Sequence, residues 1–207
     1  MNDIKSDSTP DTEEHIALVA VLLDEVRENL DHRARLHDAS KLEEPEKSAF
    51  DRLKALSLSG MAYGSPEYKA CLDAEKPAIQ HHYAANSHHP EHYPQMDGGL
   101  LAFMLRSTAQ TQEEQAKAAI ALEPEAAKLI LDTAKYIRAS ADHLESSVNG
   151  MSLFDVIEML MDWKAATERM KDGGDIRRSL EINTERFKLS PQLASILANT
   201  IEEMGWK

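Results

Sequence analysis

One stretch of the sequence decides the fold class: residues 152–170 read SLFDVIEMLMDWKAATERM. Ser152, followed three positions later by Asp155, forms a capping box, in which each side chain accepts a hydrogen bond from a backbone N–H at the start of a helix. The stretch does not alternate apolar and polar residues as a strand does. It therefore predicts a helix over Leu153–Met170, which Gly173-Gly174 ends.

Helices are also predicted on both sides of this stretch. Upstream, apolar residues at three-to-four spacing predict a helix that begins at Asp11 or Thr12 and buries a stripe from His15 to Leu30. Near the other end of the chain, Ser190-Pro191 begins a last helix. No segment alternates apolar and polar residues for long enough to predict a sheet. The fold class that follows is all-α.

Prolines divide the segment after the first helix. A short helical piece over Arg35–Lys41 is expected to break near Glu44-Pro45, where another helix begins. After a loop over Ser59–Ser65, Ser65-Pro66 is expected to begin the next helix. Pro77 then restarts a helix that continues through the first of a group of histidines.

The length of 207 residues suits a single domain. Residues 1–11 read as a flexible lead-in, and residues 12–207 as one helical domain. Within it, residues 100–149 are rich in Ala, Glu, Gln and Lys, and Pro124 begins the second of two expected helices. We interpret this segment as an inserted helical hairpin that serves packing or homodimerisation.

The composition limits the classes of partner. With 23 Lys and Arg against 36 Asp and Glu, the net charge is −13, which disfavours binding to duplex nucleic acid. The lone cysteine, Cys71, excludes an internal disulfide and a thiolate zinc site. Residues 1–12 lack the apolar core of a signal peptide, and no apolar run approaches the ~20 residues of a membrane helix. We therefore expect a cytoplasmic protein without membrane contact.

Histidines are concentrated in one segment, where five of the nine in the chain fall between His81 and His92. Burying an imidazole is costly unless its nitrogens are paired, and neighbouring imidazolium groups repel each other. A divalent metal removes both costs by binding the neutral ring. On a helix, His82, Asn86 and His89 would share one face. The alternative is a surface loop that binds metal only adventitiously.

Two further patterns carry metal-binding chemistry. His37-Asp38 supplies a nitrogen donor and a carboxylate, which can reach one ion only where the helix bends, as expected after Lys41. Glu158 and Asp162 lie four residues apart on one helical face, where their repulsion favours a cation opposite them. The alternatives are a surface ion pair for the dyad, and for Asp162 a salt bridge along its own helix.

The order of these residues resembles the HD superfamily of metal-dependent phosphohydrolases, whose pattern is an upstream histidine, an HD dyad, later histidines and a distant aspartate. The run HDASK at residues 37–41 and the run HHPE at residues 88–91 also look like the HD-GYP phosphodiesterase branch. The Gly-Tyr-Pro element that names this branch is absent, so its specificity for cyclic dinucleotides is not expected here.

A closer likeness is to a family of small phage and bacterial proteins known only as a domain of unknown function. The likeness covers most of the chain outside residues 100–149 and is informative about fold but not about substrate. The shared motifs are HDxSK at His37–Lys41, YGSxEY at Tyr63–Tyr68, NxHHPEHY at Asn86–Tyr93, EMxxDW at Glu158–Trp163 and a terminal NT at Asn199-Thr200.

The superfamily resemblance implies an HD-like helical bundle that holds one or two divalent ions, with Mn, Fe, Zn, Ni and Mg all open. One ion would be held by His15, His37, Asp38 and Asp162. A second ion, or the rest of one shell, would be held by His82, His88 and His89.

The implied activity is hydrolysis of a nucleotide or another small phosphate ester. Lys41 would neutralise phosphoryl charge, and Glu91, His92 or Glu158 would shuttle protons. The connection between the last two predicted helices would bind phosphate through Arg177, Arg178 and Arg186. A rival hypothesis is a non-catalytic, metal-stabilised binding protein such as a phage-borne modulator. A third is a di-iron oxygenase of HD type.

Overall fold

The computed structural model describes residues 7–58, 65–170 and 173–207. This part of the chain consists of helices and loops without a strand, so the all-α prediction is confirmed. Residues 1–6 of the predicted lead-in and residues 59–64 of the predicted loop lie outside the described residues. None of the described helices is both long and apolar enough to span a membrane.

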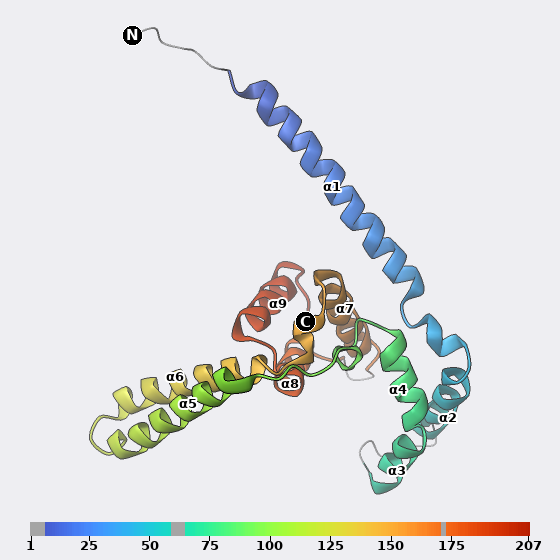
Figure 1. The fold of residues 1–207 in the computed structure, drawn as a ribbon. Coiled ribbons are helices and arrows are strands. Elements are labelled where there is room, and N and C mark those ends of the chain that lie inside the picture. The colour runs from blue at the N-terminus through green and yellow to red at the C-terminus, as the bar shows by residue number, and fades with distance from the viewer. Residues whose placement is uncertain (1–6, 59–64, 171–172) are drawn as a thin grey trace.

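The first helix, α1 (Thr9–Leu36), projects from the rest of the molecule (Figure 1). It begins after Ser8 instead of at Asp11 or Thr12. Pro10 fits the first turn, because the N–H that proline lacks would have no hydrogen-bond partner within the helix at that position. None of its residues is buried, so the prediction of a buried stripe is wrong. The apolar spacing does correspond to a helix, and the last turns of α1 contact α7.

The chain turns at the His37-Asp38 dyad itself. His37 follows the last residue of α1, and Asp38 adopts a left-handed conformation with φ of 57°. A short 3₁₀ helix, η1 (Ala39–Leu42), comes next, so the helical piece predicted over Arg35–Lys41 is divided by the turn. Aspartate tolerates this conformation better than most residues. The turn allows two consecutive side chains to face the same region.

Three helices then lead to the histidine segment: α2 (Glu46–Leu58), α3 (Pro66–Ala74) and α4 (Lys76–Ala85). Their starts agree with the proline-based predictions, and the Ser65 side chain accepts a hydrogen bond from the backbone N–H of Tyr68. Because α4 ends at Ala85, the shared helical face predicted for His82, Asn86 and His89 does not form. His88 and His89 instead lie in a loop before η2 (Pro90–His92).

The predicted hairpin is present as α5 (Gly99–Ala119) and α6 (Pro124–His143), which extend away from the body of the molecule (Figure 1). Alanines recur every seven residues on both helices and are buried where the helices meet. Small side chains at these positions allow the two backbones to approach closely. The alanines are Ala102, Ala109, Ala116, Ala127, Ala134 and Ala141.

The hydrophobic core lies in the last third of the chain and begins within η3 (Ser147–Gly150), at Val148. It is formed by α7 (Leu153–Glu168), α8 (Ile176–Phe187) and α9 (Pro191–Glu203) around fully buried side chains such as Met159, Leu160 and Ile201. The capping box of α7 is present. The segment with the three arginines is helical and not a connection, because Asp175 caps α8 and Ile176 and Leu180 bury one of its faces.

Candidate metal centre

Six of the seven predicted metal ligands come together where the end of α1, the loop after α4 and helix α7 meet. The turn after α1 supplies one histidine and one aspartate, and α4 with its following loop supplies three histidines. Helix α7 supplies the last aspartate. The six are His37, Asp38, His82, His88, His89 and Asp162, and we call them the ligand cluster.

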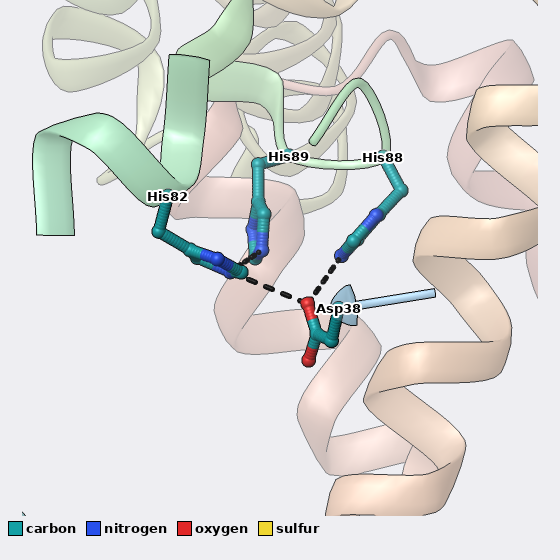
Figure 2. A group of neighbouring side chains, drawn as sticks. All are labelled: Asp38, His82, His88 and His89. Atoms are coloured by element: carbon teal, nitrogen blue, oxygen red, sulfur yellow. Dashed lines mark hydrogen bonds and ion pairs between the residues drawn. The ribbon is translucent and has the colours of Figure 1, made fainter. Parts of the chain in front are cut away.

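One part of the ligand cluster consists of three imidazoles around Asp38 (Figure 2). Asp38 Oδ1 lies 3.3 Å from His82 Nε2 and 3.6 Å from His88 Nε2. The Nε2 atoms of His82 and His89 are 2.8 Å apart. Each residue offers one donor atom, and these four atoms all lie within 4.8 Å of one another. This spacing suits a single cation.

The other part of the ligand cluster faces the second oxygen of Asp38. His37 Nε2 lies 3.6 Å from Asp38 Oδ2 and 3.7 Å from Asp162 Oδ1. Asp38 therefore belongs to both groups of potential ligands, with one carboxylate oxygen directed toward each. Helix α7 contributes Asp162 one turn after Glu158, on the same helical face.

Two buried polar atoms in the ligand cluster have no hydrogen-bond partner within the described part of the chain: Asp38 Oδ1 and His88 Nε2. Leaving such atoms unpaired costs free energy, and native structures rarely do so without a ligand or an ion. The two atoms face each other across 3.6 Å. Nitrogen and carboxylate donors suit Zn, Fe, Mn or Ni. The residues present therefore fit a divalent cation.

The charge states of the residues in the ligand cluster also favour binding of a divalent cation. Burial lowers the pKa of His82 and of His88, and together with those two neighbours it lowers the pKa of His89 to about 3. These three rings are therefore neutral, which is the form that binds metal. His37 differs because its contact with Asp162 raises its pKa to about 9. The raised pKa means that the carboxylates near His37, those of Asp38 and Asp162 among them, favour a positive charge at this position.

Two further carboxylates, Glu46 and Glu158, lie beside the ligand cluster. Glu46 is fully buried and accepts hydrogen bonds from His81 and His82. Glu158 accepts hydrogen bonds from His37 and Arg33, and its Oε1 lies 3.2 Å from His88 Nδ1. Glu46 could not be recognised in the sequence, because its histidine partners lie more than thirty positions away and glutamate is ordinarily exposed.

Asp155 has a second role that the sequence did not reveal. Besides capping α7, it accepts hydrogen bonds from Ser87 Oγ at 2.6 Å, Tyr93 Oη at 2.8 Å and Arg33 Nη1 at 2.8 Å. Although burial opposes ionisation, these donors and Ser152 hold the pKa of Asp155 well below its ordinary value. Asp155 thereby fastens the histidine loop and the end of α1 to α7.

The four residues predicted to assist catalysis lie in different surroundings. Lys41 Nζ is 2.6 Å from Asp38 Oδ2, at the edge of the ligand cluster. Glu158 lies behind two of the histidines. Glu91 forms a salt bridge with Arg186 at 2.7 Å, and His92 Nδ1 lies 3.1 Å from the Tyr83 carbonyl on the exposed side of the loop. Neither Glu91 nor His92 belongs to the ligand cluster.

The predicted phosphate-binding arginines are not gathered at the ligand cluster. Arg177 and Arg178 are exposed on the first turn of α8 and border surface hollows near Gly173. Arg186, at the other end of α8, is paired with Glu91. The helix separates the arginines, whereas a flexible connection could have gathered them around one anion.

His15 is the one predicted ligand that lies far from the others. It is exposed on α1, and at about 1.5 Å of rise per residue it is roughly 30 Å from the end of that helix. The expectation that it faces inward and joins the dyad is therefore corrected. The projecting α1 carries only its last residues to the ligand cluster.

A cavity of about 470 Å³ opens beside the ligand cluster, between the end of α1 and α7. Its surface is mostly apolar, although half of its lining residues are polar. The apolar lining comes from Leu30, Ala34, Ile157, Met161 and Ala165, and the polar lining from Asp31, Arg33, His37, Glu158 and Asp162.

Comparison with known proteins gives one match. The model of a protein family, described as a family of unknown function (DUF5662), matches residues 5–203. No curated protein and no protein of solved structure matches the chain.

Proposed function

The chain belongs to the DUF5662 family, and from the geometry of its ligand cluster we propose that it is a divalent-metal-dependent phosphohydrolase. The observation that carries the proposal is the convergence of four imidazoles and two carboxylates on one region that contains two unpaired buried atoms. Few purely structural arrangements bring so many imidazole nitrogens together in one place.

The ligand cluster divides between two positions for metal. His82, His88 and His89 with Asp38 Oδ1 would hold one ion, and His37, Asp162 and Asp38 Oδ2 would hold another or complete the first shell. Asp38 would be shared. A divalent ion there would supply Lewis acidity and lower the pKa of a water for attack on phosphorus.

The surrounding residues have roles of their own in this proposal. Lys41, whose ammonium lies at Asp38, would neutralise negative charge on the phosphoryl oxygens. The apolar cavity between α1 and α7 would hold the organic part of the substrate next to His37 and Asp162. A nucleotide or another small phosphate ester with a flat or apolar group fits this combination best. Arg177 and Arg178 have no part in it.

Turnover of phosphate esters tests the proposal. Purified protein would be incubated with a panel of nucleotides and small esters, with Mn, Fe, Zn, Ni or Mg added separately, and phosphate release would be measured. We expect metal-dependent release that His88→Ala abolishes and Arg177→Ala leaves unchanged. Release at equal rates from wild type and His88→Ala would contradict the assignment of the site.

A metal-stabilised binding protein is the second candidate, since six potential ligands from one chain could close the coordination shell. In that case zinc would raise the melting temperature and no ester in the panel would turn over. Metal-dependent turnover excludes this candidate. The di-iron oxygenase remains a weaker alternative, because nitrogen and carboxylate ligands also suit iron.

A further inference from the structure

Two glutamates, the buried Glu46 and the half-buried Glu158, lie behind the ligand histidines, on the side of each ring away from the other ligands. We propose that Glu46 and Glu158 are positioning residues, which accept the Nδ1–H hydrogens of His82, His37 and His88 and so direct the three Nε2 atoms toward the metal. The inference rests on the proposed metal site. It also assigns Glu158 a role different from the ligand or proton shuttle that its location in the sequence suggests.

Glu46 determines the tautomer of His82. Its carboxylate is fully buried and lies 2.9 Å from His82 Nδ1, 2.8 Å from His81 Nδ1 and 2.9 Å from Ser40 Oγ. Three donor groups converge on this one carboxylate, which therefore acts as the acceptor toward all of them. His82 Nδ1 must then carry the hydrogen. The lone pair is left on Nε2, which faces Asp38 and His89.

Asn86 does not compete for this nitrogen, although its Nδ2 lies 3.0 Å from His82 Nδ1. The two amide hydrogens of Asn86 already have acceptors, Ser40 Oγ and the His82 carbonyl, each at 2.8 Å. An amide nitrogen has no further hydrogen to donate. Glu46 is therefore the acceptor that fixes the orientation of His82.

Glu158 serves two histidines at once. Its Oε1 lies 2.9 Å from His37 Nδ1 and 3.2 Å from His88 Nδ1. The opposite ring nitrogens face Asp38, at 3.6 Å in both cases, and His88 Nε2 is one of the two unpaired buried atoms. The same carboxylate thus orients one histidine from each half of the ligand cluster.

Arg33 argues against Glu158 as a metal ligand. Its Nη1 lies 2.9 Å from Glu158 Oε2, so a cation bound at this carboxylate would be placed next to a guanidinium. His37, His88 and Glu158 are also close enough to hold an ion, between Glu158 Oε1 and the two Nδ1 atoms that face it. That arrangement would leave His88 Nε2 buried and unpaired, whereas an ion on the Asp38 side satisfies it.

Outer carboxylates of this kind raise the basicity of ligand histidines, and losing one typically costs about 10- to 100-fold in metal affinity. A residue that ligates metal behaves differently, because its loss removes a bound ion or its coordination entirely. Affinity and stoichiometry, measured together, therefore distinguish a positioning residue from a ligand.

The test is a zinc titration of wild type, Glu46→Gln and Glu158→Gln by calorimetry, with the exposed Glu181→Gln as control. We expect both variants to bind the wild-type number of ions about 10- to 100-fold more weakly. Glu46→Ala should lose more affinity than Glu46→Gln, because the amide oxygen still accepts one Nδ1–H. Loss of one bound ion in Glu158→Gln, or unchanged affinity in both glutamine variants, would overturn the inference.

A second measurement needs no metal. Long-range ¹H–¹⁵N spectra of metal-free protein report which ring nitrogen of each histidine carries the hydrogen. We expect the neutral rings of His82 and His88 to carry their hydrogen on Nδ1 in wild type, and the His82 signature to be lost in Glu46→Ala. A hydrogen on Nε2 of His82 or His88 in wild type would contradict the inference. If wild type binds no zinc but shows these tautomers, the proposed metal site fails while the assignment of the hydrogen bonds stands.

Discussion

Asp38 is the residue on which the two halves of the ligand cluster depend. The positive φ at Asp38 ends α1 and turns the chain, so that Asp38 and His37 both reach the ligand cluster. Its Oδ2 is paired with Lys41, and its buried Oδ1 has no hydrogen-bond partner among the described residues. A cation bound at Oδ1 would therefore neutralise a buried carboxylate oxygen that has no hydrogen bond.

Asp38→Asn tests this role with little change in backbone. Asparagine has nearly the same size and also tolerates the left-handed conformation, but it lacks the charge that holds a cation. We expect the variant to fold and to lose most of its metal. Elemental analysis after dialysis against zinc would measure this, with Glu181→Gln as control. Equal zinc content in the three proteins would contradict the assignment.

Among single polar residues, Asp155 is the one whose replacement is expected to lower the free energy of unfolding most. Asp155→Ala would leave Arg33, Ser87 and Tyr93 without their shared acceptor in a buried region. Breaking such a network costs about 3 to 5 kcal/mol. Urea unfolding of the metal-free protein measures the difference from wild type. A loss below about 1 kcal/mol would show that Asp155 does not fasten the histidine loop to α7.

At the element scale, local signals were enough to place most helices. Ser65, Ser152 and Ser190 cap helices as predicted, because a cap depends only on residues within one turn. The exposure of α1 and the helical state of α8 were not predicted. Both depend on which distant element packs against them, and periodicity within a segment does not contain that information.

The residues of the candidate site also differ in whether the sequence alone could identify them. Its histidines and aspartates could be predicted, because crowded imidazoles and the HD dyad are chemically unusual in a sequence. Glu46 and Arg33 could not, since each resembles an ordinary surface residue until the fold brings it to a histidine or a carboxylate. His15 was included because the family pattern has an upstream histidine. In the structure, α1 projects and carries His15 away from the ligand cluster.

The isolation of α1 predicts a contrast between two leucines. Leu22 on α1 is 59% exposed, whereas Leu160 on α7 is 2% exposed and packs in the core. We expect Leu22→Ala to change the free energy of unfolding by less than about 0.5 kcal/mol, and Leu160→Ala to lower it by about 2 to 5 kcal/mol. Chemical denaturation of dilute protein measures both. Similar losses would show that another surface covers α1.

The α5–α6 hairpin is expected to be dispensable for metal binding. Replacing residues 111–139 with a short Gly-Ser linker removes its outer part but keeps the contacts of Arg106 with Asp142 and Glu145 at its base. The ligand cluster includes no residue of either helix. Zinc content should therefore match that of wild type. A soluble variant without zinc would contradict this expectation.

At the scale of the whole molecule, the ligand cluster connects parts of the chain that are far apart in sequence. The turn after α1, the loop after α4 and helix α7 meet there, next to the core formed by the last three helices. A bound ion would hold these parts together and stabilise the fold by mass action, by about 2.7 kcal/mol at a free concentration of 100 times Kd. The net charge of −13 also favours cation binding.

If these side chains share one cation-binding centre, an anomalous difference map from crystals of the protein grown with zinc will show the ion there. We expect a peak bonded to Asp38 Oδ1 and to the Nε2 atoms of His82 and His88, at the usual distances of about 2.0–2.2 Å. Zinc bound only by the exposed His81 or His92, with no peak at Asp38, would show that the ligand cluster does not bind the cation.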